Sequence, residues 1–196
     1  SPIMDTLRAK YARQNAHPEY SRLKGSVPIV GVWDDHDYGR NDAGKFFAQK
    51  KESRDLMFDF LEVPENAPER KREGAYSSHV FGSGAQQVKV ILLDARYFRD
   101  TLERVDGVYQ PSRDGEVLGE AQWKWLEKEL KESQAKINLI VSGIQFLPTE
   151  HPYEKWANFP KERERLLDMI AASGARTPVL LSGDRHIAEV MKLTDP

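Results

Sequence analysis

Three carboxylates and an imidazole stand in four consecutive positions of the chain, residues 34–37 (DDHD). A mostly apolar run, residues 28–33 (PIVGVW), leads directly into them. Adjacent carboxylates repel one another and favour contact with water, so a solvated surface loop is one interpretation of this stretch. The other interpretation is a cation site, in which a bound metal neutralises the carboxylates and the preceding segment holds them in place.

Polar residues also follow three other apolar segments of the chain. They are Asp94 and Arg96 after residues 87–93, Gln145 after residues 137–144, and Asp184 and His186 after residues 178–183. Taken singly, Asp94 with Arg96 fits a local ion pair, and Asp184 with His186 fits a capping aspartate and a surface histidine. The repetition favours a shared site, because α/β proteins bind ligands at the carboxyl ends of their strands. Carboxylate and amide oxygens with imidazole nitrogens suit a hard or borderline divalent or trivalent cation.

The periodicity of apolar residues predicts the elements that must position these groups. We expect helices over residues 4–15, 43–61, 118–133 and 159–174. We expect strands over residues 28–33, 75–82, 87–94, 137–144, 178–183 and 188–193, with 75–82 and 87–94 paired as a hairpin. Strands that alternate with helices predict an α/β fold, and no linker or internal repeat divides residues 1–196 into two domains.

The composition argues against several classes of protein. The 196 residues include 29 basic and 31 acidic ones, and a net charge of −2 argues against a basic nucleic-acid surface. Cysteine is absent, so this chain holds neither a disulfide nor a thiolate metal site. No apolar run reaches the ~18 residues that a membrane helix needs. We therefore expect no nucleic-acid partner and no membrane segment in this chain.

Six stretches together resemble the successive signatures of a known family. They are WDDHDYGRNDAG, LLDARYFRD, LGEAQWKWLEKEL, VSGIQFLP, WANFPKERERL and LLSGDRHIAE. In this order they are similar to the PhoD-like phosphatases, the alkaline phosphatase D branch of the calcineurin-like metallophosphoesterases, over residues 1–193. The resemblance implies a calcineurin-like metallophosphatase sandwich, with two mixed sheets flanked by helices and a two-metal site at the strand ends.

The resemblance also implies roles for individual residues. It places Asp35 at the position of a metal-bridging ligand and His36 at that of a histidine facing the substrate phosphate. It places Gln145 at a metal-ligand position usually held by histidine, and Asp184 and His186 at two more. The site is then richer in oxygen than the usual one of the superfamily, which fits calcium and iron better than zinc alone, although other divalent metals stay open.

Further residues near these motifs are candidates for the same site. Asp34 and Asn41 are additional candidate metal ligands. Protonated His36 would donate a hydrogen bond or a proton to the ester, as a catalytic group. The guanidinium of Arg96, Arg40 or Arg185 would pair with a phosphate oxygen. Trp156 either lines the substrate pocket or packs beneath a loop.

The expected function is metal-dependent hydrolysis of phosphate monoesters or diesters by a metal-activated water. The alternative is a non-catalytic metal- or phosphate-binding module, or an inactive fragment of such an enzyme. The family's earlier motif, a strand followed by Gly-Asp, has no counterpart here. We therefore expect it upstream in the same polypeptide, and we expect residues 1–196 alone to be inactive. The location is unknown from this chain, and the resemblance implies a secreted or periplasmic protein.

Overall fold

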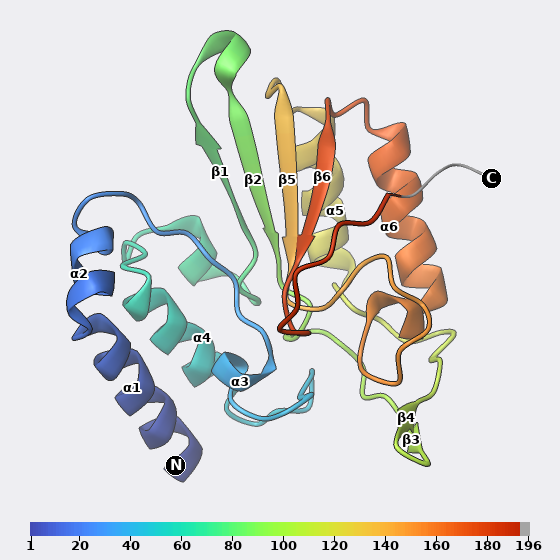
Figure 1. Ribbon diagram of the computed structural model, residues 1–196, viewed down its shortest axis with the longest axis horizontal. Helices are drawn as coiled ribbons and strands as arrows, with labels where there is room; N and C mark the ends of the chain where they lie inside the picture. Colours follow the sequence, from blue (N-terminus) through green and yellow to red (C-terminus); the bar gives the residue numbers. More distant parts are fainter. Residues whose placement is uncertain (193–196) are drawn as a thin grey trace.

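Four strands form one mixed sheet in the computed structural model, which describes residues 1–192 (Figure 1). The order is β1 (Ser77–Phe81), β2 (Val88–Leu93), β5 (Ile137–Ser142) and β6 (Pro178–Ser182). The hairpin of β1 and β2 is antiparallel, as predicted, whereas β2, β5 and β6 are parallel. Leu93, Ser142 and Ser182 lie opposite one another in register. The segments that follow these three strands therefore leave the sheet at the same edge.

Two amphipathic helices cover one face of this sheet, α5 (Glu120–Lys131) and α6 (Pro160–Ala172) (Figure 1). Their apolar residues recur every three or four positions, so each helix presents one apolar face. The apolar residues of both helices pack with those of the strands in one buried cluster. The helices contribute Trp123, Leu126, Leu130, Leu166 and Ile170, and the strands contribute Ile91, Leu93 and Ile140. This burial confirms the helices predicted over residues 118–133 and 159–174 and the strands predicted over residues 87–94 and 137–144.

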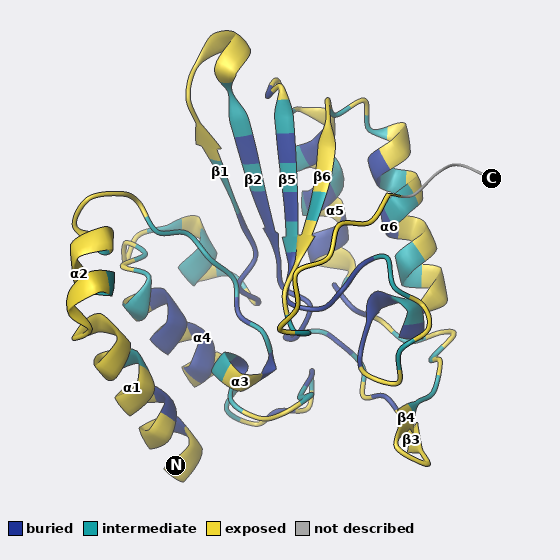
Figure 2. Cartoon of the chain, in the orientation of Figure 1, coloured by how far each residue is buried: buried dark blue, intermediate teal, exposed yellow. Residues whose placement is uncertain are grey.

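The edge strand β6 is mostly exposed to solvent, apart from Leu180 (Figure 2). Leu180 packs against the buried cluster, so its neighbours Val179 and Leu181 point to the other side of the strand. They are 37% and 43% exposed.

The N-terminal part of the chain is helical and has a hydrophobic cluster of its own. It comprises α1 (Pro2–Asn15), α2 (Pro18–Lys24), α3 (Asp35–Tyr38) and α4 (Lys50–Phe60). The buried residues of the cluster include Met4, Leu7, Trp33, Tyr38, Met57 and Phe58. Trp33 ties the cluster to the sheet, because its Nε1 donates a 2.8 Å hydrogen bond to Asp94 Oδ1 just beyond β2. Short elements complete the fold: η1 (Pro68–Lys71), η2 (Gly84–Gln86), β3 (Arg104–Val105), β4 (Val108–Tyr109) and η3 (Trp156–Asn158).

Three predicted elements differ in the structure. Residues 28–33 are not a strand but an extended connection, which is anchored by the buried indole of Trp33. Residues 43–49 precede α4 as turns, because Gly44 is pressed against the carbonyl of Arg99, where a Cβ would lie only 2.4 Å from that oxygen. Residues 188–192 form no strand, and residue 193 lies outside the described part. The mixed α/β class is confirmed, and the small β3–β4 pair is the second sheet within residues 1–192.

Candidate active site

The acidic stretch that follows Trp33 folds into the single turn of α3. Asp34 precedes the turn, and its backbone N–H donates to Asp37 Oδ1 at 2.8 Å. Asp35 is only 6% exposed, and its two oxygens accept hydrogen bonds from the backbone N–H groups of His36 (2.7 Å) and Asp42 (3.1 Å). The stretch is therefore an ordered turn, in which internal hydrogen bonds orient carboxylates that would otherwise repel one another.

A polar cleft of about 410 Å³ brings this turn together with the segment that follows β6. Seven of the eleven predicted site residues line it: Asp34, Asp35, His36, Asn41, Asp184, Arg185 and His186. The segment directly after one parallel strand, β6, supplies one wall, whereas the predicted residues that follow β2 and β5 do not line the cleft. Six lining residues were not predicted: Asp37, Asp42, Arg104, Tyr109, Tyr153 and Glu154. They come from loops, where no periodic pattern marks a residue as part of a site.

Three of the six non-glycine residues with positive φ within residues 1–192 line this cleft. Asp42, Asp184 and His186 adopt positive φ angles of 51°, 73° and 52°. Non-glycine residues in this region of φ carry a cost of order 1–3 kcal/mol, which the surrounding structure must offset. Such outliers cluster at functional sites, so their presence on both walls supports a functional role for the cleft.

Four predicted site residues lie outside the cleft. Arg96 is fully buried beneath it, with Nε donating to Asp34 Oδ1 (2.8 Å) and Nη1 2.6 Å from Glu154 Oε2. Two carboxylates thus engage the guanidinium of Arg96. Trp156 is fully buried in the core, where its Nε1 donates to Ser142 Oγ at 3.0 Å, so it packs beneath a loop. Arg40 is exposed on the surface and does not line the cleft.

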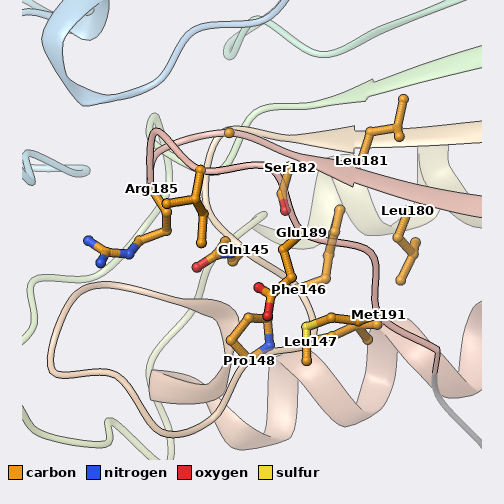
Figure 3. Close-up of a pocket in the computed structure, with 12 residues that line it drawn as sticks. Gln145, Phe146, Leu147, Pro148, Leu180, Leu181, Ser182, Arg185, Glu189 and Met191 are labelled. Carbon is orange, nitrogen blue, oxygen red and sulfur yellow. The ribbon is translucent and has the colours of Figure 1, made fainter.

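The fourth, Gln145, lines a separate pocket of about 190 Å³ (Figure 3). Arg185 lines both this pocket and the cleft. The Gln145 side chain is 8% exposed, and its Oε1 has no hydrogen-bond partner within residues 1–192. Gln145 is thus a buried acceptor near the cleft, not a ligand that faces Asp35 across it.

Known proteins resemble this chain in sequence and in fold. The sequence profile of the PhoD-like phosphatases matches residues 3–196. This chain belongs to the PhoD-like phosphatase family. It is 23% identical to alkaline phosphatase D of Bacillus subtilis (strain 168) over 207 residues, which cover 93% of this chain and 35% of that protein. A solved structure of PhoD shares the fold with a TM-score of 0.63 and 22% identity, over 79% of this chain and 34% of that one. The chain thus spans about a third of the length of these relatives.

The donor atoms of this PhoD-like cleft suit a metal ion in chemistry but not in arrangement. The carboxylates that line it are hard oxygen ligands. Among residues 1–192, however, no three Asp, Glu or His side chains converge closely enough to hold a metal ion. The described residues therefore do not form a metal centre by themselves. No helix among them has the length and apolar character required to cross a bilayer.

Gly143, the first residue after β5, allows the acidic turn to approach the sheet. A Cβ at this position would lie 2.6 Å from Asp34 Oδ1 and 3.0 Å from the carbonyl oxygen of Trp33. Gly143→Ala should therefore displace Asp34 and lower kcat/KM for a phosphate ester about 100-fold, as angstrom-scale misplacement does. The matched control is Gly31→Ala, in the connection that leads into Asp34. A Cβ at Gly31 would meet only Leu61 side-chain atoms, at 3.8 Å or more. Equal effects of the two substitutions on kcat/KM would contradict the placement of Asp34.

Asp184 should make the stability of the metal-free protein depend on pH. Burial and the nearby Asp34 carboxylate raise the pKa of Asp184 from 3.8 to about 6. Its ionisation therefore destabilises the folded state progressively as the pH rises from about 4 to 6, and fully above 6. In the presence of a chelator, Asp184→Asn should stabilise the protein more at pH 8 than at pH 4. After allowance for solvent screening, we expect its effect on the free energy of unfolding to differ by on the order of 1 kcal/mol between the two pH values. Denaturant unfolding at both pH values measures this, with Asp168→Asn on the exposed side of α6 as the control. If Asp168→Asn and Asp184→Asn change the free energy of unfolding by the same amount between pH 4 and pH 8, the pH dependence does not come from Asp184.

Proposed function

We propose that the cleft between α3 and the 183–186 segment hydrolyses phosphate esters with the help of bound metal ions. The observation that carries this proposal is the meeting of two strained acidic segments, residues 34–42 and 184–186, in one cleft of a PhoD-like phosphatase. Six carboxylates line the cleft and only two arginines do so. A phosphate anion would be repelled by such a surface, so added cations are needed before it can bind. The excess of negative charge therefore supports metal dependence.

Arg185 is the best placed arginine for contact with the phosphate. It lines the cleft, and its guanidinium stacks 3.9 Å from the centre of the Tyr153 ring. Stacking on an aromatic ring restricts the guanidinium before a ligand arrives, which lowers the entropic cost of binding. Arg96 is buried, Arg40 lies away from the cleft, and the Nε of Arg104, the other arginine that lines the cleft, donates to the carbonyl of Gly107 at 2.9 Å.

His36 is suited to donate a proton to the departing alcohol. Its imidazole is 73% exposed at the cleft, and its Nε2 lies 3.9 Å from Asp35 Oδ2. His36→Ala should slow the hydrolysis of simple alkyl phosphates by roughly 10²–10⁴-fold, because such leaving groups need a general acid. It should affect 4-nitrophenyl esters far less, since that alcohol leaves without protonation. Equal losses of kcat on both classes would assign His36 to phosphate binding.

The metals, the second sheet and the location that the family resemblance implies are proposals for this chain. Calcium and iron in a two-metal site would supply Lewis acidity for phosphate and a water of lowered pKa. Residues outside the described set would have to complete that site. The exposed apolar residues Val179 and Leu181 support the proposal that a further part of the polypeptide adds a second sheet. A location outside the cytoplasm stays a prediction from the resemblance.

The test is an assay of the protein with every residue that its gene encodes. Initial rates on 4-nitrophenyl phosphate and bis(4-nitrophenyl) phosphate are measured with calcium and iron added singly and together, and with a chelator. We expect turnover that the chelator abolishes, and the ratio of the two rates gives the preference for monoester or diester. Metal or phosphate binding without turnover would favour the alternative, a non-catalytic binding module, which the absence of a three-ligand group within residues 1–192 supports.

A further inference from the structure

Four charged side chains, those of Asp34, Arg96, Arg99 and Glu154, form a network at the base of the cleft. Arg96 contacts Asp34 on one side and, through Nη1, Glu154 Oε2 at 2.6 Å on the other. The second oxygen of Glu154, Oε1, lies 2.7 Å from Arg99 Nη2. Arg96, Arg99 and Glu154 are 0%, 1% and 2% exposed. Glu154 therefore joins two buried arginines, each of which reaches toward the cleft.

The Arg96 branch ends at Asp34. Arg96 is oriented by Glu154 from behind and presents Nε and Nη2 to one oxygen of Asp34. The orientation of Asp34 in the cleft thus depends on Glu154.

The Arg99 branch ends at Asp35. Arg99 Nη2 donates to the backbone carbonyl of Asp42 at 2.5 Å, and the Asp42 N–H donates to Asp35 Oδ2 at 3.1 Å. The Asp42 carboxylate in turn accepts from the Tyr109 hydroxyl, on the far side of the cleft. The strained backbone of Asp42 is thereby held from two directions. Glu154 is the residue that both branches share.

The loop that carries Glu154 is itself held firmly. Lys155 donates through Nζ to the carbonyls of His151 (2.5 Å) and Tyr153 (3.1 Å), and its backbone N–H donates to Asn158 Oδ1 at 2.9 Å. The next residue, Trp156, is locked in the core. The rigid loop therefore fixes the position of Glu154 relative to Arg96 and Arg99.

We infer that Glu154 is a positioning residue that sets the orientation of Asp34 through Arg96 and that of Asp35 through Arg99. The inference rests on the proposed hydrolysis of phosphate esters. It differs from a purely structural role, in which loss of the ion pairs would lower stability without a specific effect on Asp34. Lys89 and Glu129 form a comparable, mostly buried pair at 2.7 Å on the far side of the sheet, away from the cleft, and serve as the control.

The experiment is a double-mutant cycle with Glu154→Gln and Asp34→Asn, measured as kcat/KM for bis(4-nitrophenyl) phosphate in the full protein. If Glu154 acts through Arg96 on Asp34, the two substitutions share part of their effect and their losses are less than additive. We expect each single variant to lose about 10–100-fold, as supporting residues of metal and catalytic sites do. Because Glu154 also acts on Asp35 through Arg99, the double variant should lose more than either single variant but clearly less than the product of the two single losses. Glu129→Gln should combine with Asp34→Asn additively.

The outcomes separate the inference from the function on which it rests. Additive losses in an active protein, with Glu154→Gln behaving like Glu129→Gln, would overturn the positioning role. If the unsubstituted protein hydrolyses no ester under any metal condition, the proposed function fails. The same cycle is then measured as the shift of the denaturation midpoint. Non-additive shifts would support the coupling of Glu154 to Asp34, and additive shifts would overturn it.

Discussion

Arg96→Met should lower the free energy of unfolding by about 3–5 kcal/mol, the largest stability effect that we expect in this chain. Arg96 is fully buried, and it lies between the carboxylates of Asp34 and Glu154. Methionine fills much of the same volume but leaves the Glu154 carboxylate, which is 2% exposed, with one positive partner fewer. The uncompensated buried charge is responsible for most of the loss. Denaturant unfolding at pH 7 measures it.

Two controls separate charge from packing in this prediction. Arg96→Lys keeps the charge but loses the planar fork that serves two carboxylates, so we expect an intermediate loss. Arg8→Met removes an exposed ion pair with Glu52, at 3.4 Å, and should cost less than about 1 kcal/mol. A loss below about 1 kcal/mol for Arg96→Met would mean that the network does not hold the cleft together.

Local sequence patterns predict the sheet and its helices because burial imposes periodicity. The strands β2, β5 and β6 and the helices α5 and α6 all follow apolar spacings that one packed face requires. The strand-end rule also places Asp184, just beyond β6, at the cleft. Asp35 reaches the same cleft from an extended connection that is not a strand, so the rule does not account for its position.

The misplaced elements and residues depend on long-range contacts that no local pattern records. The apolar run 28–33 has strand character, yet its burial is achieved by one indole bound to Asp94. Arg96 follows a strand as an active-site arginine would, but Glu154, 58 positions later, draws it beneath the cleft. Glu154 itself lies in an irregular loop. The sequence offers one indication that Glu154 has a fixed position: it stands two residues before Trp156, and a buried tryptophan restrains the residues beside it.

Asp184→Asn should lower kcat/KM for phosphate esters about 100-fold or more, although it should not harm the fold. Within residues 1–192 no hydrogen bond or ion pair engages the Asp184 carboxylate, and its ionisation destabilises the folded protein. A carboxylate kept in a strained, electrostatically unfavourable position is expected to serve function and not stability. Removal of a charge that a reaction requires typically costs 10²–10³ in rate.

The central claim is that the cleft between α3 and the 183–186 segment is the site of phosphate ester hydrolysis. The most direct measurement is the ratio of kcat/KM for Asp184→Asn and for the unsubstituted full protein on bis(4-nitrophenyl) phosphate at pH 8, with metals supplied. The denaturation midpoint of both proteins is determined in the same buffer without metal. The account predicts a ratio of about 0.01 or lower, together with a midpoint that is unchanged or raised. A ratio within threefold of unity in a protein that hydrolyses the ester would contradict it.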